Sequence, residues 1–284
     1  MTGTINPASI DSVQEAIRAR RSVRCYTGQP LSAAHRAALE EKLREVNGSA
    51  RLQNAGVRLQ LIAAGTSGAG KLGTYGVIRG ASQYLCAVAA AGEEAAVAVG
   101  FGLEQVILHA AGLGLGTCWL GGTFRKSQFS SALAVGQGQE ILAVSPVGYP
   151  SERQSLMARM VSSMAKSSQR KAWDELFFRG DFHTPLTRVE AGRFALALEM
   201  VRLAPSAANL QPWRILKNGG GYHFYRIKPI NSMINVRMQT MDLGIAMCHF
   251  ALTAEELKLK GKLRQDEAQK NLSTDGMKYI CTWG

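Results

Sequence analysis

A stiff and polar loop is encoded by Ala204-Pro205-Ser206-Ala207-Ala208-Asn209-Leu210-Gln211-Pro212-Trp213-Arg214. Its two prolines fix backbone dihedrals and lack N–H donors, so no helix continues through the segment. Between them, Ser206, Asn209 and Gln211 can each donate and accept hydrogen bonds. Such a loop suits a planar heterocycle whose edge alternates N–H and C=O groups. The alternative is a helix end followed by a turn, with Trp213 opening a strand.

A second unusual segment lies near the N-terminus and reads Ile17-Arg18-Ala19-Arg20-Arg21-Ser22-Val23-Arg24. Apolar residues at helical spacing predict a helix over 9–20, with Ser9 as its N-cap. Arginines in the last turn complement the helix dipole, and this role accounts for one or two of them. Arginine forks also bind phosphate oxygens in bidentate geometry, and a serine hydroxyl adds a short donor. The cluster therefore favours a phosphate-bearing ligand.

Together the two segments resemble the nitroreductase family of FMN-dependent oxidoreductases. That family carries an Arg-Arg-Ser-x-Arg segment after its first helix and a Pro-Ser-x-x-Asn-x-Gln-Pro-Trp loop. Residues 112–122 are similar to the family's helix end and to the strand beneath the flavin. Residues 145–150, followed by Arg170 and Lys171, are similar to its later strand and basic phosphate contact. The four matches extend the resemblance over most of the chain.

The order of these segments differs from that of an ordinary family member, in which the loop closely follows the arginine segment. Here the arginine segment lies at 20–24 and the loop at 204–214. An internal repeat accounts for the difference, because residues 99–111 have a fainter echo in residues 241–254. The chain is therefore predicted to consist of two related halves, residues 1–165 and 166–284.

Each predicted half keeps a different part of a binding site. The first has the arginine segment, but at the expected loop position it shows only residues 49–56. The second has the complete loop, but its opening helix ends without an arginine cluster. In the family each FMN lies across a homodimer interface, and the two subunits supply one segment each. The chain thus resembles a fused dimer, an intramolecular pseudo-dimer with one FMN and no need for a partner chain to complete the site.

The resemblance also implies the roles of individual residues. Ser22, Arg20 and Arg170 or Lys171 would hold the ribityl chain and phosphate, and Arg24 or Arg20 would offset negative charge near flavin N1. The 205–211 segment would line the isoalloxazine edge. The implied cofactor-binding residues are Arg20, Arg21, Ser22, Arg24, Leu120, Gly121, Arg170, Lys171, Pro205, Ser206, Ala207, Asn209 and Gln211. No side chain is expected to be catalytic and no metal site is expected, because flavin N5 carries the chemistry.

The implied activity is NAD(P)H oxidation by a ping-pong mechanism, in which hydride passes through flavin N5 to a nitroaromatic or quinone-like acceptor. Two alternatives belong to other classes. A non-catalytic protein could store or sense FMN, and a flavin-consuming enzyme could destroy it. Steady NAD(P)H oxidation with an added acceptor distinguishes the first alternative, and loss of the flavin spectrum after reduction in air marks the second.

Composition sets broad limits on function. The net charge of +12 is spread thinly outside the clusters at 18–24 and 166–171, so we expect anionic small molecules and not nucleic acid as partners. The longest apolar run, 84–91, is too short to span a bilayer, and the first residues lack a signal-peptide layout. Five scattered cysteines indicate buried thiols in a reducing cytoplasm.

Periodicity predicts an α+β fold with an antiparallel-rich sheet wrapped by helices. Ser32 and Glu94 are plausible helix starts, and Asn218-Gly219-Gly220-Gly221 marks a hairpin. The Gly-rich stretch at 65–76 is interpreted as a loop near the site, or more simply as a linker. The predicted helices are 9–20, 32–46, 94–114, 153–168, 187–202 and 236–260. The predicted strands are 57–64, 84–90, 140–149, 213–217 and 221–227, with an edge strand in the tail at 277–283.

Overall fold

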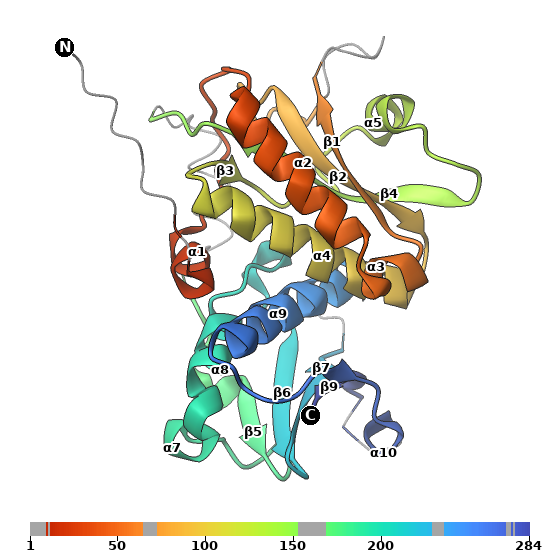
Figure 1. Cartoon of the computed structure of the whole chain (residues 1–284). Coiled ribbons are helices and arrows are strands. Elements are labelled where there is room, and N and C mark those ends of the chain that lie inside the picture. Colours follow the sequence, from red (N-terminus) through yellow and green to blue (C-terminus); the bar gives the residue numbers. More distant parts are fainter. Residues whose placement is uncertain are drawn as a thin grey trace, which may run out of the picture. The chain divides into compact units, whose positions relative to one another are not determined.

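The computed structural model describes residues 10, 12–64, 73–152, 169–228, 236–270, 274 and 276–284. Two compact units make up the chain (Figure 1). The first consists of residues 1–91 and 102–163, and the second of residues 92–101 and 164–284. The predicted helix at 153–168 lies outside the described residues.

An antiparallel sheet forms the centre of the first unit, with strand order β1-β2-β4-β3. Its strands β2 and β4 are almost entirely buried, which fits their near-continuous apolar sequences. The three longer strands confirm the predictions from sequence to within a residue or two. The strand bounds are β1 Arg58–Ala63, β2 Gln83–Ala90, β3 Gly116–Thr117 and β4 Gln139–Gly148.

Helix α2 of the first unit is fixed at both ends by polar side chains. Its predicted cap is confirmed, because the Ser32 hydroxyl accepts a hydrogen bond from the N–H of His35 at 3.1 Å. At its other end the Asn47 amide pairs with both the N–H and the C=O of Leu59, each at 2.9 Å, which ties α2 to β1. Helices in this unit are α1 Val13–Ala19, α2 Ala33–Asn47, α3 Ala50–Asn54 and α5 Lys126–Leu133.

Aromatic packing fills the core on one side of this sheet. The ring of Phe129 makes edge-on contacts with the rings of Tyr84 and Phe124, at centroid distances of 5.3 and 5.4 Å. Tyr26 and Leu120 belong to the same buried cluster. Tyr26, which comes shortly after the arginine segment, and Leu120 are therefore anchored in one core.

The second unit contains a five-stranded sheet with order β5-β6-β7-β9-β8. All its pairs are antiparallel except β5 with β6. The predicted hairpin is confirmed, with Gly219 and Gly220 at φ values of 54° and 83°. The prediction of an edge position for the tail strand is wrong, because β8 covers the outer side of β9. The strand bounds are β5 Phe177–Arg179, β6 Trp213–Asn218, β7 Gly221–Arg226, β8 Leu263–Arg264 and β9 Lys278–Trp283.

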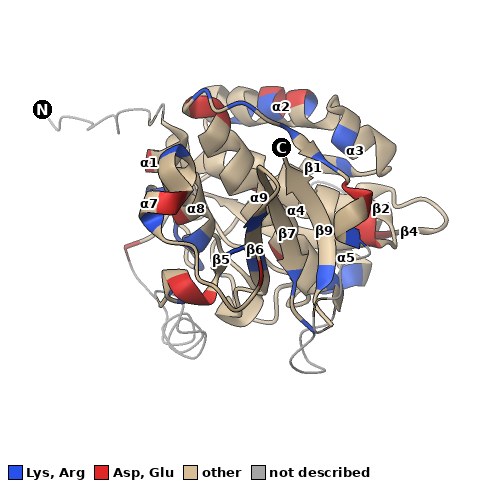
Figure 2. Ribbon diagram, turned by 90° about the horizontal axis from the view of Figure 1, so that it is seen from below, with Lys and Arg blue, Asp and Glu red and all other residues tan. Residues whose placement is uncertain are grey.

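The helix predicted over 187–202 is broken into three pieces. It begins with a capping box between Thr187 and Glu190, and Gly192 then takes φ 56° and ψ −129°, which interrupts the helix. Ribbon segments coloured for Lys, Arg, Asp and Glu are seen on helices such as α2 and α7 (Figure 2). Helical segments here are η1 Trp173–Glu175, α7 Arg188–Ala191, η2 Gly192–Phe194, α8 Ala195–Arg202, η3 Ala207–Asn209, α9 Val236–Glu256 and α10 Glu267–Lys270.

The long helix α4, Glu93–Gly112, starts in the second unit and continues into the first. Within the second unit its N-terminal half crosses α9 with the two backbones in contact. A Cβ on Gly100 would collide with the carbonyl oxygen of Met241, and one on Gly244 would collide with that of Val97. Only glycine permits this approach at both positions.

By length and composition alone, α4 could also cross a membrane, a possibility that the uninterrupted runs in the sequence did not suggest. Its 18-residue apolar window is 72% buried inside the protein, as in the core helix of a soluble protein. The five cysteines are buried thiols. The predicted α+β class with antiparallel-rich sheets is confirmed.

Candidate functional site

In the first unit the arginine segment lies along β3. The chain leaves α1 at Arg20, and the N–H of Val23 donates to the carbonyl of Thr117 at 2.8 Å. A Cβ on Gly116 would lie 2.8 Å from the Val23 side chain, so glycine is needed for this pairing. Two stretches that the sequence assigned to one site, 20–24 and 112–122, are thus brought together by backbone hydrogen bonds.

Arg20 is a buried cation with unused donors. Its Nε lies 3.9 Å from Oε1 of Glu104, a fully buried acid on α4 whose other oxygen accepts from Nε1 of Trp119 at 2.6 Å. Nε and Nη1 of Arg20 have no hydrogen-bond acceptor among the described residues. Because buried polar atoms are nearly always hydrogen-bonded, these donors fit an acceptor-rich ligand such as a flavin phosphate or ring carbonyl.

Arg24 and Arg21 differ in what they offer. Arg24 donates weakly through Nη1 to the carbonyl of Ser22 at 3.4 Å, and its buried Nε has no acceptor among the described residues. Arg21 is exposed, and its Nη1 donates to the carbonyls of Arg18 and Arg20 at the end of α1. Arg21 therefore acts as the helix-end cation that the sequence left open as an alternative, while Arg20 and Arg24 keep donors for a ligand.

Cys118 and Leu120, which follow β3, are buried beside the arginine segment. Burial raises the pKa of the Cys118 thiol, and the nearby Arg24 and Arg20 only partly oppose that shift, so the thiol stays neutral. Leu120 exchanges both backbone hydrogen bonds with Val144, at 2.8 and 3.1 Å, and its side chain belongs to the core. Gly121, half-buried, is the position here where a flat ligand could approach the backbone.

In the second unit the 204–214 loop adopts a constrained backbone. Ala208, Asn209 and Gln211 have φ values of 46°, 56° and 49°, in the left-handed region that alanine and glutamine rarely occupy and asparagine tolerates better. The loop is closed internally, because the N–H of Gln211 donates to the Ser206 hydroxyl at 2.9 Å. Pro205 and Ala207 are partly exposed in the same turn. Strain of this kind gathers at ligand-binding sites.

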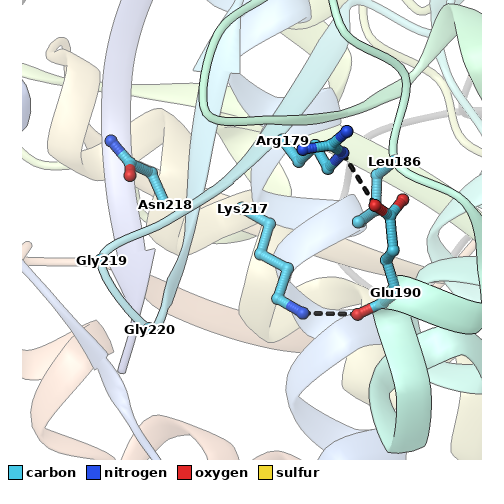
Figure 3. A pocket seen from close by; sticks show the side chains of 7 residues that line it. All are labelled: Arg179, Leu186, Glu190, Lys217, Asn218, Gly219 and Gly220. Carbon is cyan, nitrogen blue, oxygen red and sulfur yellow. Dashed lines mark hydrogen bonds and ion pairs between the residues drawn. The ribbon is translucent and has the colours of Figure 1, made fainter.

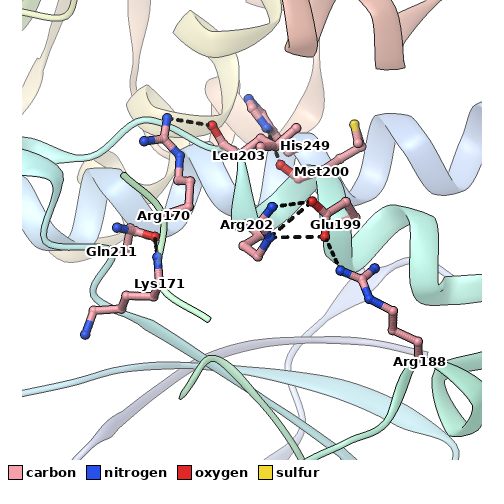
Figure 4. A network of polar contacts seen from close by, with 9 residues as sticks. All are labelled: Arg170, Lys171, Arg188, Glu199, Met200, Arg202, Leu203, Gln211 and His249. Carbon is pink, nitrogen blue, oxygen red and sulfur yellow. Dashed lines mark hydrogen bonds and ion pairs between the residues drawn. The ribbon is translucent and has the colours of Figure 1, made fainter. Parts of the chain in front are cut away.

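The basic pair at 170–171 contacts this loop directly (Figure 4). Nη1 of Arg170 donates to the Asn209 side chain at 3.2 Å, and the N–H of Lys171 donates to the Gln211 side chain at 2.8 Å. The Asn209 amide in turn donates to the carbonyl of Gln169 at 2.7 Å. The structure thus unites four predicted site residues, but it uses much of the polar capacity of Asn209 and Gln211 to hold the loop in shape.

Asp242 on α9 is a site residue that the sequence reasoning missed. Both of its carboxylate oxygens accept from the N–H of Ala207 at 3.1 Å, which fixes the start of the loop. Complete burial raises its pKa well above the ordinary range, although the Ala207 hydrogen bond acts in the opposite direction. Glu104 holds a similar place behind the arginine segment, so each unit uses one buried acid of a long apolar helix. The only signal in the sequence was a lone acid within an apolar repeat.

Asp242→Asn tests this assignment through the pH dependence of stability. A raised folded-state pKa gives stability that is fully present below the unfolded pKa of about 3.9 and is lost as the pH rises toward the folded pKa. Asparagine keeps an acceptor for Ala207 without ionising, so the variant should gain up to about 1.4 kcal/mol over wild type per pH unit above 4. Urea unfolding of both proteins at pH 4 to 7 measures the difference. A constant difference would contradict the assignment.

Other polar groups near the loop are structural. Glu199 on α8 pairs with Arg202 at 2.6 Å and with Arg188 at 2.8 Å, which joins α7 to α8 (Figure 4). His249 bonds through Nδ1 to the carbonyl of Met200 at 2.9 Å. This fully buried histidine is therefore a hydrogen-bonded core residue.

A cavity of about 400 Å³ lies at the tip of the β6–β7 hairpin, beside Gly219 and Gly220 (Figure 3). Two cations line it, but both already have partners. Nε of Arg179 pairs with Oε1 of Glu190 at 2.8 Å, and Nζ of Lys217 donates to the Glu190 carbonyl at 2.5 Å. This cavity therefore offers little charge to an anionic ligand.

Known proteins resemble this chain in sequence and in fold. The sequence profile of a family described as "Putative TM nitroreductase" matches residues 12–254. No curated protein matches the chain. A putative nitroreductase from Thermotoga maritima MSB8 has a similar fold, with a TM-score of 0.60 and 21% identity over 100% of this chain and 98% of the other.

Shorter nitroreductases align with only part of the chain. A putative nitroreductase from Desulfovibrio desulfuricans, in complex with FMN, is 26% identical and covers 54% of this chain and 94% of its own, with a TM-score of 0.38. A point mutant of the FMN- and NADPH-dependent nitroreductase NfnB from Sphigopyxis sp. strain HMH is 16% identical. The alignment covers 50% of this chain and 89% of the other, with a TM-score of 0.39. The family match over most of the sequence decides the classification: the chain belongs to the TM nitroreductase family.

Proposed function

We propose that the chain is an FMN-dependent NAD(P)H oxidoreductase that reduces small nitroaromatic or quinone-like acceptors. The observation that carries the proposal is a pair of arginines, buried Arg20 and half-buried Arg24, whose guanidinium groups keep buried donors without acceptors among the described residues. Bound FMN would supply two-electron transfer between the nicotinamide and the acceptor at N5. The FMN and NADPH named for the related proteins are carried to this chain as part of the proposal.

The residues would divide the work of binding. Arg20, Arg24 and Ser22 would hold the ribityl phosphate and offset negative charge near N1, and Gly121 would let the ring approach the backbone. The 205–211 loop, kept in shape by Asp242 and Arg170, would meet the edge of the ring. We propose further that residues 1–165 and 166–284 are related halves that share one FMN. The reaction would follow a ping-pong order, in which the oxidised nicotinamide nucleotide leaves before the acceptor enters. The buried thiols support a reducing, cytoplasmic location.

A titration of the purified chain with FMN tests the proposal, with absorbance and flavin fluorescence as readouts. We expect saturation at one FMN per chain, followed by steady NAD(P)H oxidation when a quinone or nitroaromatic is added. Two FMN per chain would contradict a single composite site. Binding without turnover would indicate storage or sensing, and loss of the bound flavin spectrum after reduction in air would indicate a flavin-consuming enzyme. No binding would overturn the proposal.

A further inference from the structure

A second cavity, of about 740 Å³, lies within the first unit and is not used by the proposed FMN contacts. It is formed by residues 73–80 and the start of α5, and its lining includes Tyr75, Arg79, Arg125 and Gln128. Its volume falls in the range that holds small ligands. The sequence suggested only a linker or loop here.

The walls of this cavity are held in place by hydrogen bonds. The N–H of Arg125 donates to the carbonyl of Gly73 at 2.9 Å, and the N–H of Gly73 donates to the Gln128 side chain at 2.7 Å. A turn is closed by the N–H of Val77 donating to Thr74 at 2.9 Å. The cavity is therefore formed before any ligand arrives, which limits the entropy lost on binding.

Tyr75 stands out at the tip of this turn. Its φ of 49° is unusual for a tyrosine, and its side chain is 61% exposed although large aromatic rings are normally buried. The Arg125 guanidinium lies over the ring, 5.7 Å from its centroid. The turn thus presents an aromatic surface beside a cation.

The charge lining the cavity is entirely positive. Arg79 and Arg125 are exposed, neither forms an ion pair with an acidic residue in the described part of the chain, and no acid lines the cavity. The backbone of Arg79 is fixed, since its N–H donates to the carbonyl of Arg24 at 2.9 Å, while its side chain remains available. Guanidinium groups without acidic partners are suited to carboxylate or phosphate.

We propose that this cavity binds a planar ring that carries an anionic group, with Tyr75 contacting the ring and Arg79 and Arg125 contacting the anion. The inference rests on the proposed function for its biological meaning, because two reactants of such an enzyme have this chemistry. One is the 2′-phosphoadenosine part of NADPH, and the other is an aromatic acceptor that bears a carboxylate.

Calorimetric titration of the full-length chain with adenosine 2′-phosphate and with 4-nitrobenzoate tests the inference. Arg79→Gln and Arg125→Gln should each weaken binding of at least one probe about fivefold, and Tyr75→Ala should weaken it while Tyr75→Phe retains it. Arg36→Gln is the matched control, because Arg36 is an exposed arginine of the same unit that pairs with Glu40. Unchanged binding of both probes in the double arginine variant, with circular dichroism showing a native fold, would overturn the inference, as would binding of neither probe by the wild type.

Kinetics distinguish the two sources of the anion. A rise in KM for NADPH but not for NADH in the arginine variants identifies the dinucleotide. A rise in KM for 4-nitrobenzoate but not for nitrobenzene identifies the acceptor. Failure of the proposed function has a separate signature, because the chain would then bind the two probes in calorimetry but neither bind FMN nor oxidise NAD(P)H.

Discussion

Gly244→Ala is expected to lower the free energy of unfolding of the second unit by about 3 kcal/mol. Helix propensity alone would favour alanine by about 1 kcal/mol. The new methyl group would instead meet the backbone of α4 at Val97, which cannot move aside as a flexible side chain can. Urea unfolding followed by tryptophan fluorescence measures the loss, because three of the four tryptophans lie in this unit: Trp173, Trp213 and Trp283.

Gly102→Ala is the control for this prediction, with unfolding followed by circular dichroism for both variants because Gly102 belongs to the first unit. Gly102 lies on the same helix as Gly100, at the start of the part that belongs to the first unit, and the atoms nearest to its Cβ would be side-chain atoms of Leu52 and Val46. Since methyl groups can shift and alanine favours the helix, we expect a change within about 1 kcal/mol. Equal losses in the two variants would show that close packing of the helix backbones is not the cause.

Arg20→Gln is expected to weaken FMN binding about 100-fold, because the variant loses a buried charge and two donors that have no acceptors among the described residues. FMN fluorescence titration gives the dissociation constant. Arg21→Gln is the matched control and should change it less than about twofold, since Arg21 is exposed and its guanidinium donates to the end of α1.

The loss of Arg20 also leaves Glu104 buried without its cation, which could disturb the fold. The double variant Arg20→Gln, Glu104→Gln also removes the Glu104 charge and separates the two effects. If the double variant bound FMN as tightly as the wild type, Arg20 would have no direct part in binding. Arg24 forms no ion pair with an acidic side chain of the described residues, and Arg24→Gln should also weaken binding.

Local sequence patterns predicted the elements whose stability is local. The period of apolar residues located α2, α4 and α9, and alternating or continuous apolar runs located β1, β2 and β4. Ser32 and the glycines of the β6–β7 turn acted as predicted, because caps and tight turns depend on residues within four positions of each other.

Features that depend on distant partners could not be predicted. Nothing near residue 177 indicates that three residues add to β6 in parallel, or that two residues at 263–264 cover β9. The break at Gly192 was hidden by apolar spacing that continues on either side. The roles of Glu104 and Asp242 could not be predicted either. The role of a buried acid depends on which N–H group or cation from elsewhere in the chain contacts its carboxylate.

The shared helix α4 has a consequence for biosynthesis. Residues 92–101 leave the ribosome early, but α9, against which they pack, is made about 140 residues later. At 5–20 residues per second, this apolar segment waits roughly 7 to 30 s for its partner. Until then the Ala-Val-rich helix face is open to chaperones or to aggregation, so it stays exposed well after β4, the last strand of the first sheet, has been made.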